Sequence, residues 1–299
     1  MIAFIQDHRD QHGVEPICRV LQIAPSTFYE HQAVARDPDR ASDRAKRDGE
    51  LRPELLRVWQ ENRSVYGARK LWHAMKREKF DIARCTVERL MRDIGIEGVR
   101  RGKKVKTTYG QPAELCPLDK VNRQFRATHP NQLWVSDFTF VSTWRGFVYV
   151  AFVIDTFANK IVGWKASTSQ ETWFVLDALE QALHARSPAE SLIHHSDRGS
   201  QYVSIKYTER LVDAGLEPSV GSVGDSYDNA LAETMIGLFK TEVINRLGPW
   251  KSKDQVEWET LKWVDWFNTK RLLEPLGYIT PQEAEDAYYQ RLKTDGIAA

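Results

Sequence analysis

Residues 133–140 read LWVSDFTF, and this stretch decides the fold. Its apolar side chains occupy both odd and even positions, as in a strand that is covered on both faces of a sheet. Asp137 stands in the middle, where a carboxylate without a partner is costly to bury. The stretch therefore predicts a central strand whose one acid serves something other than packing.

The segments after this strand predict an α/β fold. Two strands are expected over 147–155 and 160–165, after which helices and strands alternate. Helices are expected over 170–185, through 207–212, and over 228–245 and 255–268, with strands over 192–196 and 216–220. This is the ribonuclease-H-like order. We expect a ribonuclease-H-like core with a mixed five-stranded sheet and helices on both faces, preceded by small all-α helix-turn-helix units.

Two further acids stand where they can join Asp137. Asp197 ends the strand over 192–196, and Glu233 lies on the helix that follows the glycine-rich segment 221–227. Carboxylates from two strands and one helix can converge on hard cations such as Mg²⁺ or Mn²⁺. Two such ions would serve in-line phosphodiester displacement. The spacing alone is weak evidence, because the chain holds 41 acidic residues.

Charge is divided unevenly along the chain, although the net charge is only +1. Residues 1–128 hold 26 Lys and Arg against 18 Asp and Glu, a net +8, whereas residues 129–299 hold 16 against 23, a net −7. This asymmetry predicts that the first part meets a polyanion. Five cations within residues 100–106 suggest a basic arm that binds phosphates, although a solvated charged run is the alternative: Arg100, Arg101, Lys103, Lys104 and Lys106.

The pattern divides the chain into six expected segments. Residues 1–32 form a helix, a break near Pro25 and a second helix, which fits a helix-turn-helix or a plain helical hairpin. On the helix expected over 85–94, three arginines are expected to face outward: Arg84, Arg89 and Arg92. The other expected segments are a linker over 33–49, a second helical DNA-binding unit with the basic arm over 50–106, a linker over 107–128, a catalytic core over 129–250 and a helical extension over 251–299.

Several other functions are disfavoured by the composition. The longest apolar stretch, 147–154, is too short to cross a bilayer, and no leader pattern is present, so a cytoplasmic protein without a membrane partner is expected. His8, His12 and Cys18 lack the remaining ligands of a zinc site. His194 and His195 suit softer ions than Mg²⁺, so packing or hydrogen bonding is expected of them. For a stripe of aromatic residues, core packing is favoured over base stacking: Trp258, Trp263, Trp266 and Phe267.

Four strings carry a resemblance to a known family. WVSDFTFV, IHHSDRGSQY, GDSYDNALAET and WFNTKRLLEPLGYITP resemble the DDE transposases of bacterial insertion sequences, above all the OrfB component of family three, including its mycobacterial type. The catalytic core of this family resembles retroviral integrase. The resemblance extends from about Val14 to Tyr289, and it also covers Tyr66–Arg69 and Val87–Met91 in the family's helix-turn-helix region.

The resemblance implies specific roles. Asp137, Asp197 and Glu233 would be the catalytic triad that binds Mg²⁺ or Mn²⁺, and Lys240 would contact the element's terminal DNA. Asn229, on the same helix face, and Arg198 are further candidate DNA contacts, although Arg198 can equally pair with an acid. The partners would be the double-stranded terminal repeats and target DNA, so a nucleoid-associated protein that forms a homo-oligomer on DNA is expected.

One departure and several alternatives remain. Leu273 stands where the family commonly has a His, which puts the role of that His in doubt here. Family members are often active as a frameshift fusion to an upstream OrfA segment that carries a leucine zipper. This chain shows no sustained heptad pattern, so the OrfB part alone is expected. A ribonuclease-H-like nuclease that does not join strands and a catalytically silent DNA-binding regulator are the alternatives. The intact triad disfavours the regulator, and the helical units with the basic arm disfavour a nuclease with little sequence preference.

Overall fold

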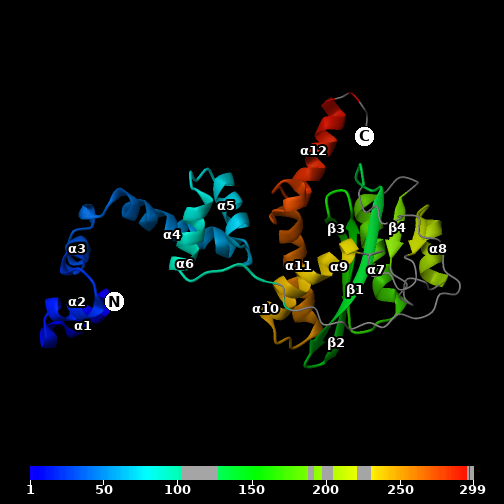
Figure 1. The fold of residues 1–299 in the computed structure, drawn as a ribbon. Coiled ribbons are helices and arrows are strands. Elements are labelled where there is room, and N and C mark those ends of the chain that lie inside the picture. Colours follow the sequence, from blue (N-terminus) through cyan, green and yellow to red (C-terminus); the bar gives the residue numbers. More distant parts are fainter. Residues whose placement is uncertain are drawn as a thin grey trace.

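A computed structural model describes residues 1–100, 102, 127–187, 192–196, 205–220, 230–294 and 296. Figure 1 shows two parts, a chain of helices at the N-terminus and a sheet with helices on both faces. The last two helices, α11 and α12, lie between these parts in this view.

The first three helices form a small unit with its own core. They are α1 (Ile2–His12), α2 (Val14–Leu21) and α3 (Pro25–Arg36). Pro25 begins α3, where its missing N–H and fixed φ are tolerated. The unit buries four side chains: Ile5, Ile17, Cys18 and Phe28.

The segment expected as a linker over 33–49 is helical for most of its length. Helix α3 continues to Arg36, and α4 (Asp43–Glu61) already begins at Asp43, with the hydroxyl of Ser42 accepting the N–H of Ala45 at its start. Only a short 3₁₀ turn, η1 (Pro38–Arg40), separates them. Polar composition suggested a linker, but Ala, Arg and Lys favour helices, and the start of α4 is largely exposed.

A second helical unit is formed by α4, α5 (Ala68–Arg77) and α6 (Arg84–Asp93). Its core contains side chains from all three helices: Leu55, Val58, Leu71, Met75, Val87 and Leu90. The turn between α5 and α6 is held by Trp72, whose indole N–H donates to the carbonyl of Ile82 at 2.8 Å.

The expected mixed five-stranded sheet is confirmed. Its strands are β1 (Leu133–Thr143), β2 (Gly146–Asp155), β3 (Lys160–Ser167), β4 (Ile193–Ser196) and β5 (Glu217–Val220), in the order β3-β2-β1-β4-β5. The first three strands pair antiparallel, whereas β4 lies parallel to β1 and β5 lies parallel to β4. The strand that was expected to be central is therefore the middle strand, β1.

Helices cover both faces of the sheet. One face packs against α7 (Thr172–Arg186) and α8 (Ile205–Asp213). Helix α7 approaches β3 so closely that a Cβ on Gly163 would lie 2.1 Å from the carbonyl oxygen of Ala178. The other face packs against one long helical rod and against α11 (Lys253–Thr269); the rod consists of α9 (Ala230–Phe239), the π-helix η2 (Lys240–Ile244) and α10 (Asn245–Leu247).

The C-terminal helices are part of the core. Trp263 of α11 packs with Phe152 of β2, with ring centroids 6.0 Å apart. Trp263, Trp266 and Phe267 are buried, which confirms core packing for them, whereas Trp258 is exposed. After the turn η3 (Glu274–Leu276), α12 (Pro281–Thr294) is anchored by Glu285. Its carboxylate pairs with Lys160 at 2.5 Å and with Arg186. Among the described residues, no helix has the length and apolar character needed to cross a bilayer.

Candidate active site and nucleic-acid interface

Asp137 lies on the face of the sheet that α9 covers. Its cross-strand partner in β2 is Phe152, and partners in an antiparallel pair point to the same face. Phe152 packs against Phe239 of α9, with ring centroids 5.1 Å apart. The Asp137 side chain is half-buried, and its Oδ1 accepts the N–H of Phe138 at 2.8 Å. Asp137 therefore points toward the side of the sheet on which Glu233 is carried.

The parallel pairing of β1 with β4 determines where β4 ends relative to Asp137 of β1. Ser196, the last residue of β4, pairs with Ser136, and both strands run in the same direction. Asp137 follows Ser136 in the chain, as Asp197 follows Ser196. Asp197 itself lies outside the described residues, as do Arg198 and Asn229.

Glu233 lies in the first turn of α9. The helix buries Ala232, Met235, Ile236 and Phe239, which are spaced as one helical face, and it packs against β1. Glu233 is beside this buried face, and its side chain is exposed. The helix thus presents the carboxylate at the edge of its contact with the strand that carries Asp137.

Below the strand ends, polar side chains link four elements. Nε2 of His194 lies 2.8 Å from Oγ of Ser136 and 3.2 Å from the hydroxyl of Tyr207, and His195 Nδ1 lies 3.0 Å from Oγ of Ser219. Both histidines are fully buried, so the expectation of packing and hydrogen bonding is confirmed. The network ties β4 to β1, to α8 and to β5 at the end of the sheet where Asp137 lies.

Burial also sets the charge of His194. Desolvation, with a smaller contribution from neighbouring His195, lowers the pKa of His194 to about 3, so the ring is neutral near pH 7. Desolvation likewise raises the pKa of the Tyr207 hydroxyl. Sequence reasoning did not find Ser136 and Tyr207, because their role depends on contacts between β1, β4 and α8. Within the described ranges, to which Asp197 does not belong, no group of three or more His, Cys, Asp or Glu side chains is arranged to hold a metal ion.

The candidate DNA contacts are only partly described. The ammonium of Lys240 lies 5.5 Å from the ring centroid of Phe140, three residues beyond Asp137 on β1. Lys240 is therefore close to the strand that carries the candidate metal ligand. Arg100 is almost fully exposed, with Glu97 3.9 Å away. Arg101, Lys103, Lys104 and Lys106 lie outside the described residues, as does most of the linker expected over 107–128.

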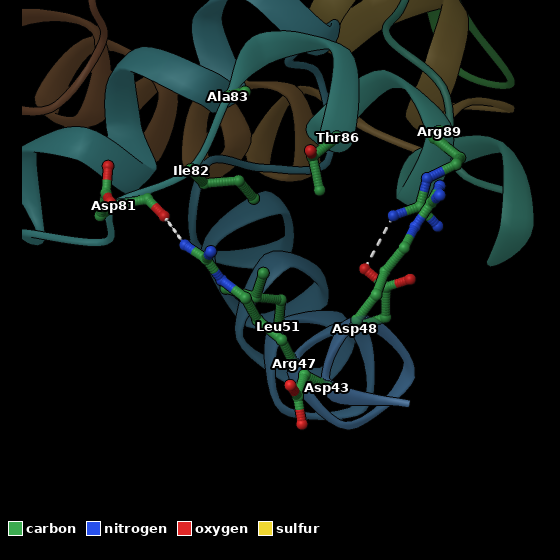
Figure 2. Close-up of a pocket in the computed structure, with 10 residues that line it drawn as sticks. Asp43, Arg47, Asp48, Leu51, Asp81, Ile82, Ala83, Thr86 and Arg89 are labelled. Carbon is green, nitrogen blue, oxygen red and sulfur yellow. Dashed lines mark hydrogen bonds and ion pairs between the residues drawn. The ribbon is translucent and has the colours of Figure 1, made fainter. Parts of the chain in front are cut away.

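The hollow between α4 and α6 changes the interpretation of Arg89. Figure 2 shows Arg89 turned toward Asp48 of α4, and Arg47 reaching the carbonyl of Asp81. The Arg89–Asp48 pair is 2.7 Å long, and its hydrogen bond lowers the pKa of Asp48. The expectation that Arg89 faces outward is wrong, because its charge fastens α6 to α4. Arg84 and Arg92 are exposed on α6, as expected.

Comparisons with known families and relatives agree with this arrangement. Family models described as "Integrase core domain" match residues 127–226 and 214–281, and one described as "HTH-like domain" matches residues 46–104. The transposase for insertion sequence element IS629 of Shigella sonnei is 56% identical over 299 residues, 100% of both chains. This chain belongs to the IS3 family of insertion-sequence transposases.

Other relatives extend the comparison. The putative transposase for IS986/IS6110 of Mycobacterium tuberculosis is 52% identical over 274 residues, covering 90% of this transposase and 97% of that protein. The HTLV-2 integrase catalytic core domain in complex with magnesium has 17% identity and a TM-score of 0.42, covering 54% of this chain and 99% of that one.

Family membership establishes the class of activity. The chain is a DNA transposase, an enzyme of the DDE transposase and integrase class, and the hydrolytic nuclease and the silent regulator receive no support. Enzymes with this core normally use a divalent metal, and the family and its HTH-like domain imply DNA binding. Leu273, at the position of the family's His, is buried, and its backbone N–H donates to the carbonyl of Ile279 at 3.1 Å.

The buried His194 predicts a pH dependence of stability. The unfolded chain binds a proton at His194 below about pH 6.5, whereas the folded chain does so only near pH 3, so acid favours unfolding across this window. Replacing His194 by Gln removes this linkage. The free energy of unfolding of the wild type should therefore fall more steeply between pH 7 and pH 4.5 than that of the variant, by up to about 1.4 kcal/mol per pH unit.

Urea unfolding followed by tryptophan fluorescence at several pH values measures this difference. His184→Gln is the matched control, because His184 is exposed on α7. Its profile should run parallel to that of the wild type. Parallel profiles for the wild type and His194→Gln would contradict a neutral, buried His194.

Proposed function

We propose that this transposase cuts the ends of an insertion sequence and joins them to target DNA at a divalent metal centre held by Asp137, Asp197 and Glu233. The observation that carries the proposal is the pairing of Ser136 with Ser196 across β1 and β4. Each serine directly precedes one of the two aspartates in sequence. The packing of α9 on β1 supports Glu233 as the third ligand.

The donor set suits a hard cation. Three carboxylates offer oxygen ligands, which Mg²⁺ and Mn²⁺ prefer. Either ion would keep coordination positions that water or phosphate oxygens can occupy. The half-buried Asp137 and the exposed Glu233 border the same side of the sheet. When bound, two such ions would activate the attacking oxygen and stabilise the leaving oxygen in an in-line displacement.

The chain's own residues hold the two strands in place and set the charge around the three carboxylates. The neutral His194 and its hydroxyl partners hold β4 against β1 without adding a charge beside the carboxylates. Lys240 is proposed to contact the terminal DNA, because its ammonium lies over Phe140 near the same end of β1. Asn229 is proposed as a further contact because its sequence spacing puts it on the helix face of Glu233, and Arg198 because a cation next to Asp197 can contact a phosphate.

DNA recognition is assigned to the N-terminal part, and we call residues 43–93, which contain α4–α6, the DNA-reading unit. Helix α6 is the second helix of the α5–α6 pair, the position from which a helix-turn-helix protein enters the major groove, and it exposes Arg84 and Arg92. The basic arm over 100–106 would bind adjacent phosphates. The proposed partners are terminal repeats and target DNA in the bacterial nucleoid, a second copy of the chain on DNA, and an upstream OrfA segment as a frameshift fusion.

The triad is tested by replacing Glu233 with Gln, which keeps the size of the side chain but removes its charge. End cleavage and strand transfer should both fall, by at least on the order of 1,000-fold, because the same ligands serve both steps. Binding to element ends should persist. The assay is the cutting and joining of labelled terminal DNA with Mg²⁺ or with EDTA, using the OrfA fusion if the single chain is silent.

Glu209→Gln provides the control, because Glu209 is an exposed acid on α8 of the same sheet-based part. It should cut at the wild-type rate. Asp137→Asn and Asp197→Asn should match Glu233→Gln, and combined substitutions should add little further loss. Wild-type cutting by Glu233→Gln, or strong cutting in EDTA, would refute the proposed centre.

The DNA contacts are tested by the salt dependence of binding. Replacing Lys103, Lys104 and Lys106 by Ala should reduce the slope of log affinity against log salt by about 0.9 for each lysine that contacts a phosphate. Lys240→Ala should instead weaken binding to element ends more than binding to random duplexes. Lys293→Ala, at an exposed position on α12, is the control. An unchanged slope in the triple variant would exclude the arm from phosphate binding.

A further inference from the structure

Two motifs that are far apart in the sequence meet in the structure. Tyr66, which precedes α5, is fully buried, and its hydroxyl accepts the backbone N–H of Leu272 at 2.8 Å, although 206 residues separate them. The same hydroxyl lies 3.4 Å from the carbonyl oxygen of Lys270, to which it donates. The Tyr66 ring also contacts that of Trp266, with centroids 6.0 Å apart. The DNA-reading unit is thus hydrogen-bonded to the segment that follows α11.

Ion pairs extend this contact on both sides. Arg63 pairs with Glu259 of α11 at 3.2 Å, and both side chains are less than one-fifth exposed. Arg69 pairs with Glu274 of η3 at 3.0 Å, but both are more than half exposed, so this pair contributes less. Arg77 pairs with Glu283 of α12, and the ring of His73 stacks on Tyr278 with centroids 3.6 Å apart. In every ion pair the cation comes from the DNA-reading unit and the acid from the C-terminal helices.

The contact continues inward to the helical rod that carries Glu233. Arg271, next to Leu272, is buried and pairs with the buried Glu242 of η2 at 2.5 Å. The indole N–H of Trp263 donates to the same carboxylate at 3.0 Å. Glu242 is nine residues beyond Glu233 in the continuous rod of α9 and η2. We call this set of contacts, from Tyr66 through Arg271 to Glu242, the joint.

We propose that the joint sets the distance and the rotational phase between the DNA bound by the DNA-reading unit and the catalytic carboxylates, so that the transposase measures its cutting position along the terminal repeat. This inference rests on the proposed function. If the covalent connection alone joined the two parts, the catalytic site could reach phosphates at several distances from the recognised sequence. A packed, hydrogen-bonded joint allows one distance, and a misplacement of about 1 Å can cost on the order of 100-fold in rate.

The first test uses the full chain and a modified DNA end. Footprinting of the wild type on terminal DNA locates the segment that the DNA-reading unit protects. Five base pairs, about half a helical turn, are then inserted between this segment and the normal cutting site. The wild type should lose at least about tenfold in cutting at the terminal phosphodiester of this substrate, because the end is carried to the opposite side of the duplex. Undiminished cutting there would overturn the inference.

The second test loosens the joint. Tyr66→Phe keeps the ring but removes both hydroxyl hydrogen bonds, and Tyr29→Phe, at an exposed position on α3, is the matched control. Arg63→Glu and Glu259→Arg each break the shielded ion pair, and the double variant restores opposite charges. On the unmodified end, Tyr66→Phe and each single charge variant should spread cutting over neighbouring phosphodiesters and lose at least about tenfold at the normal one. DNA affinity should change less than about twofold, because none of the contacts that define the joint involves a residue of α6.

The charge swap separates positioning from a loss of folding. The double variant should return the cutting position to that of the wild type, which two independently destabilising changes would not do. An unchanged position and rate in Tyr66→Phe and in both single charge variants would overturn the inference. The wild type on the unmodified end distinguishes the two proposals. Failure of the proposed function would appear there as a lack of Mg²⁺-dependent cutting, whereas failure of this inference would leave that cutting intact.

Discussion

The parallel pairing of β1 with β4 is the contact on which the arrangement of the catalytic part depends. It places Ser196 opposite Ser136, and therefore brings the end of β4 to the position where β1 carries Asp137. The pairing is reinforced from within the fold, since His194 reaches Ser136 and Tyr207 through one ring nitrogen. A shift by one residue would turn the Asp137 side chain to the face covered by α7, away from Glu233.

The charge asymmetry of the chain has two uses. We expected the basic N-terminal part to meet a polyanion, and membership in the transposase family agrees with DNA as that partner. Some of its cations, however, are paired with acids of the protein itself. Arg63, Arg69 and Arg77 pair with acids of the C-terminal helices, and Arg89 pairs with Asp48. Opposite charges therefore also hold the two parts of the chain together, and the remaining cations are the candidates for DNA phosphates.

The sheet and its order could be predicted because burial on both faces leaves a direct mark on the sequence, as it does over 133–140. The candidate acids could be named because family motifs surround each of them. The helices within the segment 33–49 could not be predicted, because an exposed helix and a polar linker share the same composition. The contact of Tyr66 with Leu272 could not be predicted, because no local pattern indicates which residue 206 positions away will pack against a buried tyrosine.

We propose that the ends of β1 and β4, together with α9, hold one metal centre. Anomalous diffraction from crystals of the full chain bound to terminal DNA and soaked with Mn²⁺ tests this directly. We expect Mn²⁺ density in contact with carboxylate oxygens of Asp137, Asp197 and Glu233. Density bound only elsewhere, or a structure in which Asp197 lies away from Asp137, would contradict it.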